Sequence, residues 1–568
     1  MMIRDVKTFR SLIDRLSTRG DRIAMMERRD GEFEKITFNE ISNWAKAISA
    51  FLTDKNIEKP TRVAILSKNR MEWGIAYFGI TYGGCIAVPI DHELKEREIT
   101  HILKISEAKG IFTEERFLPV VLDIASKLDI ELIITLDNSG EKHLRDVIKK
   151  GEKILKERGV KEVEIDRNDT ASIIFTSGTT GVSKGVELSH WNFIFDTIQA
   201  ERLLNLSEDE VFLSILPIHH TFEFTAGFLE PIFCGGRVVY ARSLKSKELL
   251  EDLENSKTTL LLGVPLLFEK LYQGIRKEIS KQNFLKKGMV NVGLGLGNIT
   301  RRIKGSPSRN FITKLVLKEA GLDSIRILIA GGAALDPAVE LGIKALGLNI
   351  VQGYGLTEAS PIVTINPIDK SKVGSIGKTF PEVTVRIDNP NKEGIGEIIV
   401  KGDNVMKDYY KNSESTNETI RDGWLYTGDM GWMDEEGYVY ITGRKKSVIV
   451  SRGGKNIYPE ELEYLLLKSE YIEEVLVKGY FKKERAGLTA IIYPNWEKID
   501  EYLKEEERNE FAIKETLKNE VGKVNKTLAS YKRISSIELR EEEFPKTTTG
   551  KIKRYLFGEK KIPVNGQS

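Results

Sequence analysis

Cysteine is the scarcest residue in this chain, with only two among 568 residues. Cys85 and Cys234 lie far apart in apolar surroundings, and neither belongs to a CxxC pair. The sequence therefore supports neither a disulfide framework nor a cysteine-ligated zinc site. Two small buried hydrophobic side chains in a reducing cytosol are the better interpretation.

A long hydrophobic run is also missing. Residues 1–16 carry charges throughout what would have to be the apolar core of a signal peptide. The most apolar stretch, Leu260–Phe268, is much shorter than the roughly 20 residues that span a bilayer. We therefore expect a soluble, cytoplasmic protein, at most peripheral to the inner face of a membrane.

Neither sign of charge is in excess. The chain has 86 basic and 84 acidic residues and a net charge of +2, so no general attraction to nucleic acid is expected. Charged residues make up 30% of the chain, with many Lys, Glu and Arg and few His and Cys. That balance is typical of thermophile proteins.

Strand-like apolar runs alternate with helix-like stretches over most of the chain. The predicted strands are Arg62–Leu66, Cys85–Pro89, Ser172–Phe175, Thr259–Val264 and Ile325–Ala330. Helices are expected after Asn69, which is a candidate N-cap, from about Leu266 and from about Pro337. Such alternation predicts layered α/β structure with largely parallel sheets.

The pattern changes twice toward the C-terminus. Short strands without a long helix predict a β-rich subdomain over residues 373–440. After Gly443, predicted helices and strands mix again: Pro459–Leu467, Glu474–Lys478, Leu488–Tyr493 and Glu507–Leu528. We therefore expect a large N-terminal α/β domain, residues 1–443, and a small α+β domain, residues 447–568.

A loop of small hydroxyl residues and glycines follows the strand that ends near Phe175. It runs Thr176-Ser177-Gly178-Thr179-Thr180-Gly181-Val182-Ser183-Lys184. Glycines let the backbone approach a ligand, hydroxyl and N–H groups donate to phosphate oxygens, and the lysine adds a positive charge. This is not a Walker loop, because Ser183 stands where that motif needs glycine. A phosphate-binding loop is favoured over an ordinary polar turn.

This string resembles the phosphate-binding signature of the adenylate-forming superfamily, which includes acyl-CoA synthetases, peptide-synthetase adenylation domains and luciferases. It departs from the signature at Ser183, where the family usually has proline. Further stretches resemble family motifs in the family's order: 331–335, 352–358, 427–429, 443–446 and 545–554. The resemblance implies a large nucleotide-binding domain followed by a small mobile one.

The resemblance also implies how a nucleotide is bound. Tyr354 would lie against adenine, and Thr357 would meet the α-phosphate. Glu358, together with Thr176, would hold Mg²⁺. The turn at 331–335 would border adenine and the acyl group. In this turn Gly332 and Ala333 would face the nucleotide. Gln352 and Gly353, just before Tyr354, would face it as well.

Asp429 and Arg444 are expected at the ribose. Taken alone, an aspartate in a Tyr-Thr-Gly-Asp turn more often caps its own turn. The resemblance instead implies that Asp429 accepts hydrogen bonds from both ribose hydroxyls and that Arg444 reaches the same sugar. It also makes 444–446 the interdomain junction, with Lys446 as the hinge.

Lys551 lies in the stretch 545–554, which matches the family's catalytic-lysine motif. A basic solvated turn would be the better interpretation if the stretch stood alone, because this chain is rich in lysine. The resemblance implies that Lys551 neutralises charge while acyl-AMP forms. A second face of the small domain, carrying Gly453, Gly454 and Lys455, would then meet the thiol acceptor.

Two adjacent histidines, His219 and His220, need a separate interpretation. The resemblance implies that His220 borders the acyl and adenylate pocket and belongs to the catalytic set. A bare histidine pair also raises the question of a transition metal. Adjacent residues on a strand point to opposite faces, and the sequence shows no second His/Cys cluster near them. A transition-metal site is therefore not expected.

Two stretches, Asn69–Trp73 and Gly263–Tyr272, look most like the long-chain acyl-CoA synthetase branch. Ten basic residues and one acid, interleaved with apolar side chains, follow within 276–314. Such a segment suits an anionic membrane surface, where fatty acids partition. A solvated basic insert explains the same composition equally well.

We therefore predict a ligase that uses ATP, Mg²⁺ and coenzyme A to convert a long-chain fatty acid into its CoA thioester through acyl-AMP. The alternatives are an acyl-AMP ligase that loads a carrier protein, a CoA ligase for a shorter or aryl acid, and a luciferase-like monooxygenase. A catalytically silent acyl-binding protein is disfavoured by the intact Glu358 and Lys551. No nucleic-acid partner is expected, and the oligomeric state stays open, with a dimer as one option.

Overall fold

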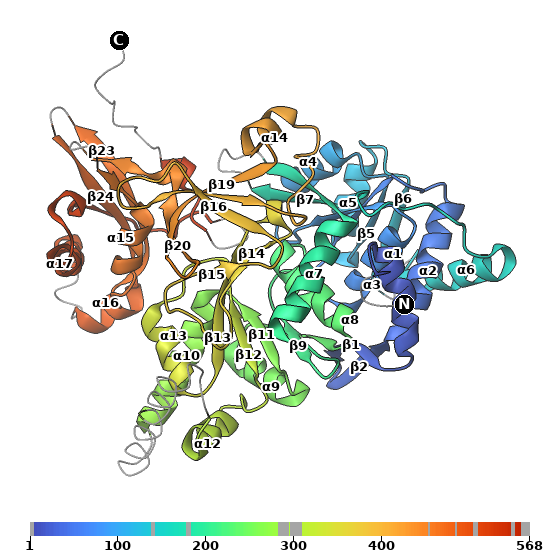
Figure 1. Cartoon of the computed structure of the whole chain (residues 1–568), viewed down its shortest axis with the longest axis horizontal. Coiled ribbons are helices and arrows are strands. Elements are labelled where there is room, and N and C mark those ends of the chain that lie inside the picture. The colour runs from blue at the N-terminus through green and yellow to red at the C-terminus, as the bar shows by residue number, and fades with distance from the viewer. Residues whose placement is uncertain are drawn as a thin grey trace.

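The structure is a computed structural model that describes residues 5–137, 142–177, 183–281, 295, 309–451, 455–482, 485–503, 509–546 and 551–557. Sheets covered by helices form a large N-terminal part, and a smaller α+β part follows it (Figure 1). The predicted fold class is thereby confirmed. Within the described residues, no helix has both the length and the apolar character needed to cross a bilayer.

The first sheet of the large part has the strand order β6-β5-β3-β4-β7-β8. Its strands are β3 (Arg62–Leu66), β4 (Ile86–Ile90), β5 (Gly110–Thr113), β6 (Leu132–Thr135), β7 (Thr170–Ser177) and β8 (Ser183–Ser189). The strands β3 to β7 run parallel, and β8 returns antiparallel to β7. The residues of β3 and β4 are almost all buried, as expected for parallel strands covered on both faces.

The second sheet has the order β16-β17-β19-β20-β15-β14-β13-β12-β11-β9-β10-β1-β2, with β18 (Ile420–Arg421) beside β19. Its first half holds β1 (Ile23–Arg29), β2 (Glu32–Thr37), β9 (Val211–Ser214), β10 (Arg237–Tyr240), β11 (Leu260–Gly263) and β12 (Ile327–Ala330). Its second half holds β13 (Asn349–Gly355), β14 (Ile362–Ile365), β15 (Gly377–Thr379), β16 (Thr384–Asp388), β17 (Gly396–Lys401), β19 (Trp424–Met433) and β20 (Tyr438–Arg444). The β-rich stretch predicted at 373–440 is thus joined by β14 to the parallel strands.

The helices of the large part cover these sheets. They are α1 (Phe9–Leu16), α2 (Phe38–Asp54), α3 (Met71–Tyr82), α4 (Glu96–Ser106), α5 (Leu118–Ala125), α6 (Leu144–Arg158), α7 (His190–Leu204), α8 (Glu230–Cys234), α9 (Ser246–Ser256), α10 (Pro265–Lys281), α12 (Phe311–Glu319), α13 (Pro337–Ala345) and α14 (Ser413–Thr419). The five strands predicted before residue 373 are all present, with ends shifted by at most two residues.

Helix α3 is buried on all sides, as its uniformly apolar sequence predicts. Its Trp73 and Tyr77 rings stack with centroids 5.5 Å apart. The Tyr77 ring lies 4.4 Å from that of Phe224, on the π-helix Phe222–Leu229 that follows β9. This aromatic cluster joins α3 of the first sheet to the second sheet, so the two sheets share one core.

The expectation that Asn69 caps α3 is wrong. Arg70 occupies the N-cap position, and the Asn69 side chain reaches the segment after β9 instead. It donates to the carbonyl of Leu216 at 2.6 Å and accepts from the N–H of Ile218 at 2.9 Å. The amide therefore holds the segment that leads to His219 and His220, because it can satisfy two backbone groups there and only one in its own helix.

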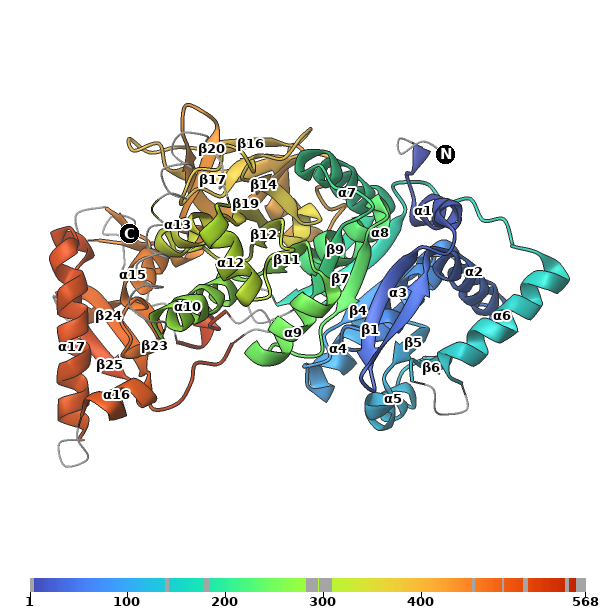
Figure 2. The same ribbon diagram turned by 90° about the horizontal axis from the view of Figure 1, so that it is seen from below.

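The small C-terminal part has its own sheet and core. Its elements are β21 (Ile449–Val450), β22 (Asn456–Ile457), α15 (Pro459–Leu466), β23 (Ile472–Lys482), β24 (Arg485–Pro494), α16 (Trp496–Tyr502), α17 (Glu510–Thr527) and β25 (Ile534–Leu539). Buried Leu462, Val477, Ile492 and Leu517 are part of one hydrophobic cluster confined to this part. Figure 2 shows α17 lying along the β23-β24-β25 sheet.

Two further sequence expectations concern the surface and the thiols. Most of the basic segment at 276–314 lies outside the described residues. Cys85 and Cys234 are both free and buried, as predicted. Burial raises the pKa of each thiol to about 12, so both remain protonated and unreactive near neutral pH.

Candidate active site

A cavity of about 2610 Å³ lies where the small part faces the large one. It gathers side chains that are distant in sequence and come from β7, the turn after β9, β13, β19, β20 and the C-terminal segment. The predicted site residues that line it are Thr176, Lys184, His220, Gly332, Ala333, Gln352, Gly353, Tyr354, Thr357, Glu358, Asp429, Arg444, Lys446 and Lys551.

The remaining predicted site residues are not placed in this cavity. Gly178, Thr179, Thr180, Gly181, Gly453 and Gly454 lie outside the described residues, as does the side chain of Ser177. Lys455 is exposed, and its Nζ lies 4.6 Å from the ring centroid of Tyr531 in the small part. It does not line the cavity in this arrangement of the two parts.

The β7–β8 hairpin sets the geometry of the predicted phosphate-binding loop. Thr176 pairs with Lys184 across the two strands, so both residues stand at the base of the loop. The Ser183 hydroxyl donates to the carbonyl of Thr176 at 3.0 Å. Serine at the usual proline position thus supplies a hydrogen bond that ties the two strands together.

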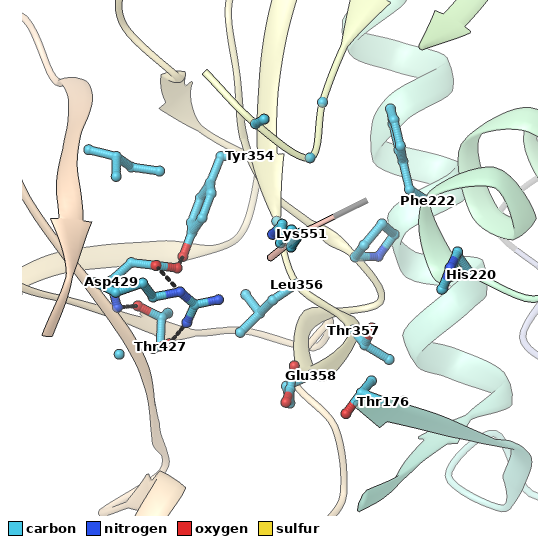
Figure 3. Close-up of a pocket in the computed structure, with 18 of the residues that line it drawn as sticks. Thr176, His220, Phe222, Tyr354, Leu356, Thr357, Glu358, Thr427, Asp429 and Lys551 are labelled. Carbon is cyan, nitrogen blue, oxygen red and sulfur yellow. Dashed lines mark hydrogen bonds and ion pairs between the residues drawn. The ribbon is translucent and has the colours of Figure 1, made fainter. Parts of the chain in front are cut away.

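Glu358 sits in a short 3-10 helix, Thr357–Ala359, directly after β13. The hydroxyl of Tyr409 donates to its Oε1 at 2.7 Å. Burial and the Glu358 charge raise the pKa of Tyr409, which keeps this hydroxyl a donor. Figure 3 shows Glu358, Thr357 and Thr176 grouped in one part of the cavity. These side chains offer oxygen atoms to a phosphate-bound cation.

Asp429 anchors a network on another side of the cavity. Its Oδ2 accepts from the hydroxyl of Tyr354 at 2.6 Å, and its Oδ1 lies 2.9 Å from Nε of Arg444. The Arg444 guanidinium also donates to the carbonyl of Thr427 at 3.2 Å. The Asp429 carboxylate thus bonds to side chains of β13 and β20. Within its own turn, the Asp429 backbone N–H donates to the Thr427 hydroxyl.

The turn after β12 leaves open space beside Tyr354. Gly332 has φ +84°, a left-handed conformation that favours glycine. The N–H of Leu335 donates to Oε1 of Gln352 at 3.2 Å, which holds the turn against β13. Gln352 on β13 therefore positions the turn. At Gly332 an added Cβ would meet only a Val264 methyl, at 3.8 Å, whereas at Gly331 it would meet the Phe222 ring.

His219 and His220 lie in a turn after β9, so the assumption that they lie on a strand is wrong. His220 lines the cavity near Thr221, whose hydroxyl lies 3.5 Å from that of Thr357. Burial lowers the pKa of His220; the Asp91 charge opposes this and the Lys551 charge adds to it. The imidazole is therefore neutral at physiological pH.

Lys551 reaches the cavity from the small part and lies among the labelled residues of Figure 3. Lys551 is exposed to the open cavity. Partial loss of solvation beside the large part, followed by the positive charge of Arg444, lowers the pKa of Lys551, and Asp429 partly opposes the shift. An anionic ligand in this space would raise the pKa of Lys551 again. The site is therefore built to receive negative charge.

The comparisons with known proteins agree with this geometry. A family model described as AMP-binding enzyme matches residues 13–410, and one described as AMP-binding enzyme C-terminal domain matches residues 446–560. The chain belongs to the AMP-binding enzyme family. The family assignment confirms the resemblance on which the site residues were predicted.

Relatives of this AMP-binding enzyme span nearly its full length. The chain is 29% identical over 557 residues to a long-chain-fatty-acid–CoA ligase of Bacillus subtilis, covering 92% of this chain and 89% of that protein. It is 27% identical to a chloroplastic long-chain-fatty-acid–[acyl-carrier-protein] ligase of Arabidopsis thaliana, covering 88% and 77%. The crystal structure of the anthranilate CoA ligase AuaEII with anthranoyl-AMP has the same fold, with a TM-score of 0.76, 23% identity and 98% coverage of both chains.

Some side chains of the site carried no sequence signal. Tyr409 lies outside the predicted motifs, although it bonds Glu358 and lies 4.9 Å from the Lys184 ammonium. An apolar wall of the cavity comes from Ala200, Leu204, Leu206, Phe212 and Ala226. These positions are scattered over α7, the connection that follows it, β9 and the π-helix, so no spacing in the sequence connects them.

Asp429→Asn is expected to weaken ATP binding by about tenfold or more. The amide has the same shape but loses the charge that Arg444 pairs with, and charge-assisted hydrogen bonds contribute about 1.5–3 kcal/mol each. Isothermal titration with ATP measures the change. Asp422→Asn, on an exposed turn with φ +52° that suits asparagine, is the matched control and should bind ATP as the parent does. Equal affinity in both variants would contradict the role of Asp429.

Proposed function

We propose that this AMP-binding enzyme activates a long-chain fatty acid with ATP and transfers the acyl group to coenzyme A. The observation that carries the proposal is the meeting of Lys551, from the small part, with Asp429, Arg444, Glu358 and Thr176 in one cavity. Opposite charges and oxygen ligands are arranged there around a space that is large enough for a nucleotide and an acyl chain.

In the first step an oxygen of the substrate carboxylate attacks the α-phosphorus of ATP, and pyrophosphate leaves with the bonding electrons. The negative charge on the phosphoryl oxygens grows in the transition state. The Lys551 ammonium and the Thr357 hydroxyl are placed to stabilise it. Asp429 and Tyr354 would hold the nucleoside end, so that the phosphates point toward Thr176 and Lys184.

Mg²⁺ fits the oxygen atoms on the phosphate side of the cavity. Glu358 offers a carboxylate and Thr176 a hydroxyl, which are the hard ligands that this ion prefers. Bound there with ATP, the ion would offset phosphate charge. Tyr409 donates to one oxygen of Glu358 and so orients the other toward the cavity side shared with Thr176.

In the second step the sulfur of coenzyme A attacks the acyl carbon and AMP leaves. We propose that residues 453–455 must first replace Lys551 at the site, by rotation of the small domain about Lys446. Lys446 is exposed in the short 3-10 turn Lys445–Ser447. The preceding Lys445 is anchored to buried Glu397 of the large part by an ion pair of 2.6 Å. Because Lys445 is held by Glu397, rotation of the small domain would occur in the backbone torsions that follow Lys445.

A long acyl chain is supported by the apolar wall of the cavity. Ala200 and Leu204 on α7, with Ala226 on the π-helix, form a surface that can take methylene groups. Fully buried Glu230 also lines the cavity. Burial and the charges of Glu201 and Asp196 raise the pKa of Glu230 well above its ordinary value, which favours its neutral form. A neutral acid does not repel an aliphatic chain as a carboxylate would.

One assay with ATP and free coenzyme A distinguishes this proposal from a ligase with another acyl acceptor and from a ligase for another class of acid. A ligase for carrier proteins would stop at acyl-AMP when offered free coenzyme A. An aryl or short-chain ligase would complete the reaction but prefer benzoate or acetate. Oxygen consumption that depends on acyl-AMP would indicate a luciferase-like monooxygenase instead.

The purified enzyme is expected to release AMP with ATP and coenzyme A most efficiently from acids of about a dozen or more carbons, since each buried methylene contributes about 0.8 kcal/mol of binding. A panel from acetate to long-chain acids and benzoate, ranked by kcat/KM, measures this. Ala200→Phe should shift the preference toward shorter chains, and exposed Ala338→Phe on α13 should not. The long-chain proposal fails if acetate or benzoate ranks first.

Lys551→Ala is expected to slow acyl-AMP formation at least about a hundredfold, because a lost electrostatic contact to the transition state costs about 3 kcal/mol or more. Thioester formation from supplied acyl-AMP should be spared. In the parent enzyme the lowered pKa of Lys551 removes its charge at a lower pH than in an ordinary lysine. The alkaline limb of kcat/KM for ATP should therefore move to higher pH in Lys551→Arg. Equal loss of both half-reactions in the alanine variant would make Lys551 structural.

Lys446→Pro is expected to leave acyl-AMP formation largely intact and to abolish thioester formation. Proline holds φ near about −65° and restricts the residue before it, so the turn can keep only one arrangement. Single-turnover assays of each half-reaction measure the split. Lys446→Ala keeps the torsion free and serves as the control. Parental turnover of coenzyme A by the proline variant would rule out Lys446 as the hinge.

A further inference from the structure

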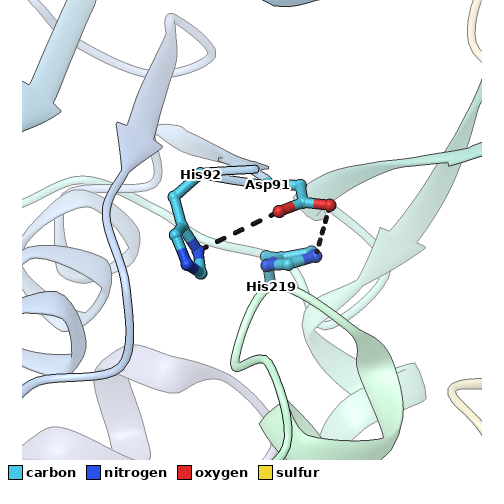
Figure 4. A group of neighbouring side chains, drawn as sticks. All are labelled: Asp91, His92 and His219. Atoms are coloured by element: carbon cyan, nitrogen blue, oxygen red, sulfur yellow. Dashed lines mark ion pairs between the residues drawn. The ribbon is translucent and has the colours of Figure 1, made fainter. Parts of the chain in front are cut away.

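A second group of ionisable side chains lies on the His219 side of the cavity, apart from the nucleotide residues. Asp91 and His92 follow directly after β4, and His219 lies in the turn after β9 (Figure 4). His219 Nε2 is 3.5 Å from Asp91 Oδ2, and His92 Nδ1 is 3.9 Å from Asp91 Oδ1. One nitrogen or oxygen of each residue lies within 4.8 Å of the others. The sequence shows no second His/Cys cluster near His219, but the fold brings Asp91 and His92 beside it.

These polar atoms are buried and lack partners. Asp91 is 7% exposed and His219 6% exposed. Among the described residues, Asp91 Oδ2, His92 Nδ1 and His219 Nε2 make no hydrogen bond. Buried polar atoms are rarely left unpaired in native proteins, and three that converge on one point indicate a missing ligand.

An internal ion pair does not account for the group. Charge-assisted N–H···O bonds are usually about 2.7–2.9 Å long, shorter than both contacts here. Contacts of 3.5 and 3.9 Å therefore leave the three buried atoms without a hydrogen-bond partner in the part of the chain that the structure describes.

We propose that Asp91, His92 and His219 bind one first-row transition-metal dication of the Zn²⁺ type. Two imidazole nitrogens and one carboxylate oxygen are ligands that such ions prefer. Around tetrahedral Zn²⁺, ligand atoms about 2.0–2.2 Å from the ion are about 3.4 Å from one another. The observed spacing of 3.5 Å, and at most 4.8 Å, needs only small side-chain rotations to reach that geometry.

The metal site has a structural consequence for the cavity. Asp91 and His219 also line the cavity, so a fourth coordination position is accessible to water from that side. The ion would join the end of β4 in the first sheet to the turn after β9 in the second. That turn carries His220, which lines the cavity, and is already held by Asn69. The site is distinct from the oxygen ligands Glu358 and Thr176.

Metal binding to the full-length chain tests the proposal without any assay of turnover. Chelator-treated protein is titrated with Zn²⁺ by calorimetry and with Co²⁺ by visible absorption, and retained zinc is counted by mass spectrometry after dialysis. We expect one ion per chain. Asp91→Asn and His92→Asn should each weaken binding by at least about tenfold, because each removes one of three ligands. His92 is only partly buried and Asn is nearly isosteric with Asp, so both variants should fold.

Two control variants make the outcome decisive. His101→Asn changes an exposed histidine on α4 outside the group, and Glu358→Gln removes the carboxylate of the nucleotide side; both should bind Zn²⁺ as the parent does. Circular dichroism of each metal-free variant confirms folding. The proposal is overturned if the parent retains no zinc, if Asp91→Asn and His92→Asn bind with parental affinity, or if only Glu358→Gln loses the ion.

Discussion

The hydrogen-bond ladder of β13 is the interaction on which the site depends, because this strand links the two halves of the large sheet. Its first residues pair in parallel with β12, and its last three pair antiparallel with β14. Gln352 and Tyr354 therefore stand at the edge where the cavity opens, and Glu358 follows within a single turn of chain. A shift of this strand by one residue would turn each of these side chains to the other face.

Charged side chains of the two parts meet at this edge. Lys551 and Arg444 are both cationic and face one cavity, while Asp429 supplies opposing charge close by. The lowered pKa of Lys551 reflects loss of solvation and repulsion by Arg444, which Asp429 partly opposes. A polyphosphate bound here would add negative charge beside both cations, so nucleotide binding and the position of Lys551 over the site would stabilise one another.

The His219 side of the cavity depends on contacts between segments of the two sheets. The Asn69 amide, just before α3, holds the backbone that follows β9, and the Trp73–Tyr77–Phe224 aromatic cluster packs behind it. The Asp91–His92–His219 group is a polar contact between segments of the same two sheets, and three of its buried atoms make no hydrogen bond within the described part of the chain. An apolar cluster can satisfy itself by burial, whereas these polar atoms need a ligand.

The sequence alone determined the α/β class, the strand positions and the local motifs, because apolar periodicity and short glycine- and hydroxyl-rich turns are properties of neighbouring residues. It identified Tyr354, Glu358, Asp429 and Lys551 as members of one site through the resemblance to a family. Only the tertiary structure decided that Asn69 reaches another sheet, that Tyr409 bonds Glu358, and that Asp91 meets His219. These pairs are separated by 51 to 147 positions, and such contacts leave no periodic pattern because they arise from packing of whole sheets.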